Sequence, residues 1–88
     1  MTTMFARHKV DDYNNWKRMY DEIDNVRKEK GVTADHVYRD TNDPSYVIVT
    51  HQFKNEAAAT NFANSDELKT AMQKAGVQGQ PEFWFGED

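Results

Sequence analysis

The sequence contains no cysteine, and this absence excludes several kinds of chemistry at once. Disulfide bonds, zinc–thiolate sites and thiol nucleophiles all require that side chain. No apolar run approaches the roughly 20 residues that a membrane-spanning helix needs, and the first residues lack the apolar segment of a secretion signal. We therefore expect a cytoplasmic protein that has no membrane partner.

Positive charge is also scarce. Eleven lysines and arginines stand against fifteen aspartates and glutamates, which gives a net charge of −4. Nucleic-acid-binding domains usually carry a basic surface, so no nucleic-acid partner is expected. The clearest basic cluster, Arg27, Lys28 and Lys30, falls where a helix should end, and the helix dipole explains basic residues there. Glycine-rich phosphate loops and nucleophile elbows are absent as well.

What the chain does have is enough aromatic and apolar residues to fold. Aromatic residues make up 12% of the sequence, which argues against disorder despite the high proportion of charge. A chain of 88 residues is expected to form a single domain, so residues 1–88 are assigned to one. A core of this size buries only roughly 60–65% of the surface of the unfolded chain, so a second subunit would add stability.

Alternation of apolar and polar residues predicts four strands, because strand side chains point to opposite faces in turn. The strands are expected at residues 3–10, 32–39, 46–53 and 82–85. Between the second and third lies a run of turn-forming residues, Asp40 to Ser45, which is typical of a hairpin loop.

Helical spacing predicts two helical segments. The first covers 12–30 and ends at Gly31; its apolar stripe comprises Tyr13, Trp16, Tyr20, Ile23 and Val26. The second starts after Asn55, is interrupted at Asn64–Ser65 and closes at Gly76. The order β-α-β-β-α-β, with its second helix broken in two, predicts an α+β, ferredoxin-like fold with a four-stranded antiparallel sheet.

The three histidines fall in three different predicted strands, each in step with apolar neighbours. His8 alternates with Ala6 and Val10, His36 with Ala34, and His51 with Val49. Each is therefore expected on a covered face of the sheet. Because histidine titrates near neutral pH, this pattern indicates a pocket with His8, His36 and His51 as candidate catalytic residues. The alternative is that they are buried, hydrogen-bonded and inert.

The register of the hairpin decides whether two of these histidines meet. If Arg39 pairs with Tyr46, His36 and His51 are diagonal neighbours on one face, roughly 7–8 Å apart. A shift of one residue would put them on opposite faces. A loop of this length permits both registers. His8 belongs to the first strand, which in this topology lies beside the third, and could approach His51.

Aromatic side chains supply candidate walls for a flat ligand. The predicted substrate-binding residues are Tyr13, Trp16 and Tyr20 of the first helix, together with Tyr38, which is on the histidine side of its strand. Packing in the core explains the same residues without any ligand. The spacing of the histidines matches no local metal-binding motif, so no metal site is predicted.

Apolar residues also occur on both faces of two strands. Phe83, Trp84 and Phe85 follow one another, as do Val47, Ile48 and Val49. Helices can cover only one face of this sheet, and an apolar second face needs a partner. A twofold dimer with its sheets packed back to back would supply one, so a homodimer is predicted.

The sequence resembles the dimeric α/β-barrel superfamily and, within it, small proteins similar to antibiotic biosynthesis monooxygenases. The similarity is carried in order by Arg7-His8-Lys9-Val10, Asp12-Tyr13, Trp16-Lys17, Asp43-Pro44, Ala71-Met72, Ala75-Gly76-Val77, Gly79, Pro81 and Glu82. The resemblance implies a homodimer whose two sheets form a barrel. It also implies that any ligand pocket lies between each sheet and its own helices.

Two functions from different classes follow from this resemblance. The first is a protein that binds an apolar or aromatic small molecule and catalyses cofactor-independent oxygenation or cyclisation, with His8 handling the proton. The second is a non-catalytic stress-type or accessory protein with structural histidines. Haem binding through one histidine is a third possibility. The family's haem degraders use an asparagine, a tryptophan and a histidine, but Asn14 and Asn15 fall on the wet side of their helix.

Overall fold

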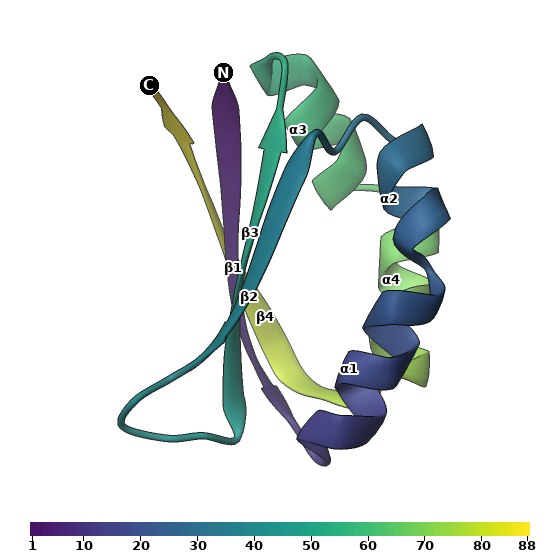
Figure 1. Cartoon of the computed structure of the whole chain (residues 1–88), viewed down its shortest axis with the longest axis vertical. Helices are drawn as coiled ribbons and strands as arrows, with labels where there is room; N and C mark the ends of the chain where they lie inside the picture. Colours follow the sequence, from purple (N-terminus) through teal and green to yellow (C-terminus); the bar gives the residue numbers. More distant parts are fainter.

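The computed structural model describes residues 1–88 as one antiparallel sheet with every helix on the same face (Figure 1). The strands are β1 (Thr2–Val10), β2 (Ala34–Arg39), β3 (Tyr46–Phe53) and β4 (Val77–Glu87), in the spatial order β2-β3-β1-β4. The helices are α1 (Tyr13–Glu22), α2 (Asp24–Glu29), α3 (Glu56–Ala63) and α4 (Asp66–Lys74). The predicted α+β, ferredoxin-like fold is confirmed.

Polar side chains begin three of the four helices. Asp12 accepts a hydrogen bond from the amide of Asn15 at the start of α1, and Asn55 accepts one from Ala58 at the start of α3. Ser65 accepts from the amide of Leu68, so it starts α4 directly after the end of α3. These caps satisfy amides that lack a partner within the helix. The predicted break in the second helical segment is confirmed.

The single helix predicted over 12–30 is wrong, because the chain forms two helices that are separated at one residue. Ile23 leaves the helical conformation, with φ −103° and ψ 22°, and separates α1 from α2. The stretch Ile23-Asp24-Asn25-Val26 consists of residues with low helix propensity, which explains the break. Apolar spacing continues across it, so periodicity alone cannot detect the interruption.

The last strand is longer than the predicted 82–85, because pairing with β1 begins already at Val77. The register of β4 shifts between Arg7 and Lys9, so β4 has a bulge opposite His8. Gly79 takes a positive φ of 69° within this bulge. β4 is an edge strand, where Pro81 and a bulge are both tolerated.

The hairpin uses the second of the two registers left open by the sequence. Arg39 pairs with Val47 and His36 pairs with Thr50, so His36 and His51 lie on opposite faces of the sheet. The side chain of Asp40 accepts hydrogen bonds from the amides of Asn42 and Asp43, while its own amide donates to Tyr46. This turn extends the ladder by one residue and thereby sets the register.

The core lies between the sheet and the helices. Met4, Val47 and Phe53 are its largest fully buried apolar side chains on the sheet, and Trp16, Ala59 and Phe62 cover them from the helices. The other face of the sheet carries no helix (Figure 1). Phe5, Tyr38 and Trp84 lie there with 38%, 53% and 50% of their surface exposed. None of the helices is long and apolar enough to cross a membrane.

Candidate functional site

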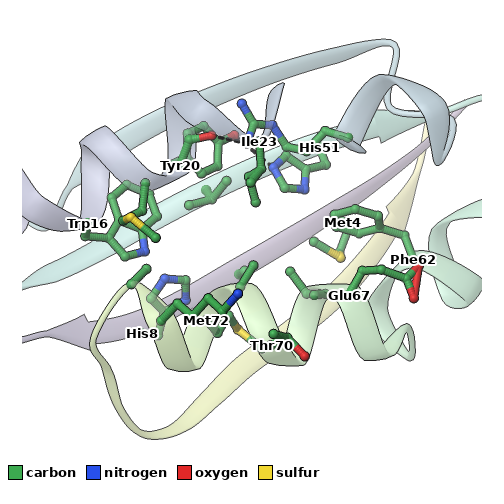
Figure 2. A pocket seen from close by; sticks show the side chains of 18 of the residues that line it. Met4, His8, Trp16, Tyr20, Ile23, His51, Phe62, Glu67, Thr70 and Met72 are labelled. Atoms are coloured by element: carbon green, nitrogen blue, oxygen red, sulfur yellow. Dashed lines mark hydrogen bonds between the residues drawn. The ribbon is translucent and has the colours of Figure 1, made fainter. Parts of the chain in front are cut away.

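A cavity of about 400 Å³ lies between the inner face of the sheet and the helices. Figure 2 shows it with α1 on one side and α4 on the other. Thirteen of its twenty lining residues are hydrophobic, which is typical of a site for a small organic molecule. The strands contribute Met4, Ala6, His8, Val49, His51 and Phe83. The helices, the turn between α1 and α2, and the residue after α4 contribute the rest, including Trp16, Tyr20, Ile23, Phe62, Leu68 and Met72.

His8 occupies one end of the cavity, next to Trp16 and Met72 (Figure 2). Its side chain is buried, and its ring lies 5.7 Å from that of Trp16. No protein group hydrogen-bonds to either ring nitrogen. Burial lowers the pKa of His8 from 6.5 to about 4. At neutral pH the ring is therefore uncharged, and one of its nitrogens carries a free lone pair.

His51 lies at the other end of the cavity and is part of a hydrogen-bonded chain. Its Nε2 is 2.9 Å from the hydroxyl oxygen of Tyr20, and that hydroxyl donates to Oδ2 of Asp35 at 2.6 Å. The ring stacks on Tyr20 and meets the edge of Phe62. Burial, with a smaller contribution from the charge of Arg27, lowers the pKa of His51 to about 4. Burial and the hydrogen bond to Asp35 raise the pKa of Tyr20.

Arg27 holds this chain in place from α2. Its guanidinium lies over the ring of Tyr20, 3.6 Å from the centroid, and its Nη1 donates to the carbonyl oxygen of Tyr20 at 2.5 Å. It also pairs with Asp24 and Asp35, at 3.3 and 3.6 Å. The side chain is only 5% exposed, so this is a buried cation with several partners.

The two histidines of the cavity do not meet. His51 pairs with Met4 on β1, four residues before His8, which corresponds to about 13 Å along the strand. The cavity therefore has two separate polar positions. No group of three or more metal-ligating side chains is present.

The remaining candidates lie elsewhere. His36 and Tyr38 are on the outer face of the sheet, where their rings stack 6.1 Å apart and stay exposed. The register of the hairpin separates them from the cavity. Tyr13 packs against the core beneath Arg39, and it is not among the lining residues. Of the predicted aromatic wall, only Trp16 and Tyr20 line the cavity.

Sequence reasoning missed two residues of the site, Arg27 and Asp35. In the sequence, Arg27 belongs to a basic cluster at a helix end, which the helix dipole explains; in the structure it is the one buried residue of α2. Asp35 pairs with His51 only in the register that the structure has. Its alternation with Val37 is the one sequence signal that could have indicated an inward position.

The fold and the cavity define a class: a ferredoxin-like α+β protein with an apolar cavity between its sheet and its helices. The family model for antibiotic biosynthesis monooxygenases matches residues 11–74, and the chain belongs to this family. The predicted resemblance is thereby confirmed. No functionally curated protein matches the sequence significantly.

Solved structures agree on the fold. A putative antibiotic biosynthesis monooxygenase from Bordetella bronchiseptica is similar with a TM-score of 0.81 at 9% identity, covering 99% of this chain and 95% of that one. A second one, from Caulobacter crescentus, has a TM-score of 0.77 at 14% identity, with coverage of 99% and 88%. SnoaB, a cofactor-independent oxygenase from Streptomyces nogalater (variant N63A), has a TM-score of 0.76 at 9% identity, with coverage of 99% and 91%.

Proposed function

We propose that the protein binds a flat, mostly apolar small molecule in the cavity and that this molecule carries a hydrogen-bond donor. The single observation that carries the proposal is His8, a buried imidazole in an apolar cavity with no protein partner for either nitrogen. Buried polar groups in native proteins are nearly always hydrogen-bonded. A hydroxyl group on a ligand supplies the partner that His8 lacks.

The chemistry that suits this arrangement is proton removal without a resident cofactor. A neutral imidazole can accept the proton of an aromatic hydroxyl group, and the electron pair stays on the ligand oxygen. The resulting electron-rich anion is open to attack by O₂ at a ring carbon. With 1,5-dihydroxynaphthalene, uptake of one O₂ would give hydroxynaphthoquinone and one water. Membership of the family, and the cofactor-independent oxygenase SnoaB as a structural neighbour, support this reaction class.

The test uses 1,5-dihydroxynaphthalene with the wild-type protein and with His8→Ala. We expect the probe to quench the fluorescence of Trp16 in wild type, and oxygen uptake to exceed the spontaneous rate. In His8→Ala we expect the uptake to fall at least tenfold, because general base catalysis contributes about 10²–10⁴-fold. Equal rates in both proteins, or a spectral change on adding haem, would contradict the proposal.

A non-catalytic role is the second candidate. His51 is hydrogen-bonded to Tyr20, which in turn donates to Asp35, so His51 can be explained by a structural role alone. Binding of the probe without any oxygen uptake above background would favour a carrier or accessory protein over an enzyme. In either case we place the protein in the cytoplasm.

We also propose that two copies associate through the outer faces of their sheets. Across the middle of that face, Thr50, Phe5 and Trp84 lie side by side on β3, β1 and β4, and Tyr38 pairs with Ile48 on the next rung. Sedimentation should give about 20 kDa, twice the chain mass of 10.3 kDa. Trp84→Glu should sediment as a monomer, because it places a charge in the proposed interface. Lys69→Glu, on the exposed side of α4, should remain a dimer. A wild-type monomer would contradict the dimer.

A further inference from the structure

His51 is placed at the far end of the cavity by β3 and is packed from three sides. Asp35 of β2 and Met4 of β1 are its neighbours across the sheet, and Tyr20 of α1 lies over its ring. In Figure 2, Tyr20 and Ile23 lie on the helix side of His51, while His8 is at the opposite end of the cavity. The mechanism proposed above uses His8 and leaves this second buried imidazole without a role.

The hydrogen bonds around Tyr20 determine which nitrogen of His51 carries the proton. A tyrosine hydroxyl has one hydrogen to donate, and a carboxylate can only accept. Tyr20 gives its hydrogen to Asp35, so its oxygen must accept from Nε2 of His51. Nε2 therefore carries the hydrogen in the neutral ring.

The other nitrogen is left with a free lone pair. Nδ1 of His51 is buried and has no partner within the protein, while the residue lines the cavity and is only 3% exposed. The stack on Tyr20 and the edge contact with Phe62, 5.3 Å between ring centroids, hold the plane of the ring. The lone pair thus has a fixed direction, unlike that of His8, whose two nitrogens are both without partners.

We propose that His51 is a second proton-accepting residue of the cavity, and that Tyr20 and Asp35 are positioning residues that fix its tautomer. The inference rests on the proposed function in one respect, since it requires a ligand in the cavity. A hydroxyl group of the ligand donates to Nδ1; on transfer, the O–H bond breaks, the Nδ1–H bond forms and the electron pair stays on the ligand oxygen. The imidazolium then donates through Nε2 to Tyr20, whose own hydrogen remains directed at Asp35.

Arg27 stabilises the chain of His51, Tyr20 and Asp35 in the ligand-free protein. Its charge balances that of Asp35, 3.6 Å away, and its guanidinium lies over the ring of Tyr20, 3.6 Å from the centroid. Besides Arg27, the charged side chains that line the cavity are Asp66, Glu67 and Lys74 of α4. Histidine, tyrosine and carboxylate therefore form a chain in which each hydrogen has one assigned place.

The first experiment measures the tautomer of His51 by ¹⁵N NMR in the ligand-free protein at pH 7. We expect a protonated Nε2 and a bare Nδ1 in wild type, and a mixture of tautomers in Tyr20→Phe, which retains the ring but not the hydroxyl group. His8, whose nitrogens have no partners, serves as the internal control and should not change. A protonated Nδ1 in wild type, or an unchanged spectrum in Tyr20→Phe, would overturn the positioning role.

The second experiment compares two probes that differ in one hydrogen-bond donor, 1-naphthol and 1-methoxynaphthalene. We expect wild type to bind 1-naphthol more tightly than 1-methoxynaphthalene. In His51→Phe and His51→Gln the ratio of the two affinities should fall about tenfold, which is the effect of losing one buried hydrogen bond. The two variants guard against a failure of either one to fold, which circular dichroism would reveal. If the preference disappears only in His8→Phe, the role of His51 is wrong and the proposed function stands. If neither probe binds to wild type, both are wrong.

Discussion

The two ends of the cavity carry the same side chain in different settings. His8 and His51 come from the same face of the sheet, are both buried, and have pKa values lowered to about 4. His8 has no hydrogen-bond partner, whereas His51 is bound to Tyr20. The comparison separates two effects: burial decides whether the ring is charged, and hydrogen bonding decides which nitrogen is free to act.

The largest effect that we expect for these two histidines is a loss of folding stability at acidic pH. Both rings have a pKa of about 4 in the folded protein and 6.5 as the ordinary value, so the unfolded chain binds more protons between these limits. Their contribution to stability is complete above pH 6.5 and is lost as the pH falls through 4. Between pH 6.5 and pH 4, protonation linked to each ring should lower the free energy of unfolding by about 3 kcal/mol, or roughly 6 kcal/mol for the two together.

Urea unfolding at pH values from 7.5 to 4 measures this loss. The carboxylates with lowered pKa values, Asp24, Asp40, Asp43 and Glu67, affect stability at lower pH, below their ordinary range near 4. His36→Ala removes an exposed histidine and serves as the control, so its curve should match that of wild type. A stability that stays constant from pH 7 to pH 4.5 would show that the two rings are not buried as described.

An intermediate effect should follow from Arg27→Met, which keeps the aliphatic length and removes the charge. The variant leaves Asp35 without its cation and the carbonyl of Tyr20 without its donor, so we expect a loss of about 3 kcal/mol in the free energy of unfolding. The pKa of His51 should rise, because Arg27 lowers it, while that of His8 should not move. Arg18→Met, at an exposed ion pair with Glu22, should cost under about 0.5 kcal/mol.

The smallest effect, and the most informative about function, should come from His8→Leu. Replacing two unpartnered buried nitrogens by methyl groups should stabilise the protein by about 1 kcal/mol, because no hydrogen bond is lost. The matched His51→Leu variant removes a bonded ring and should stabilise less or destabilise. Thermal unfolding at pH 7.5 compares the two. A large loss of stability in His8→Leu would mean that His8 has a structural role.

Most of the fold could be predicted from the sequence, because apolar periodicity and helix caps are local patterns. Leu68, Ala71, Met72 and Ala75 have the spacing of one helix face, and all four line the cavity. Ser65, where the second helical segment is interrupted, caps the start of α4. The site depended on two non-local facts. The register of the hairpin turned His36 and Tyr38 outward and Asp35 inward, and the turn at Asp40 that sets it could not be derived from loop length.

The second non-local fact concerns Arg27. The helix dipole accounts for a basic residue at this helix end, yet the guanidinium of Arg27 packs on Tyr20 in the interior. A charged residue is buried only where several partners are assembled around it, and those partners come from three elements, α1, α2 and β2. No pattern within one segment reveals such an assembly, although the aromatic stripe correctly placed Trp16 and Tyr20 on the inside.

The interruption at Ile23 has a consequence for how relatives of this chain should be compared. In an unbroken helix the carbonyl of Tyr20 would accept from the amide of Asp24, and no side chain would be needed there. Here the carbonyl is capped by Arg27 instead. In a family member whose first helix runs straight through this point, the helix itself supplies a partner for that carbonyl, so one interaction that favours a buried arginine here is already met. Where the arginine is also absent, the cavity has no buried positive charge at this end and should select ligands by different polar groups, even if every histidine is retained.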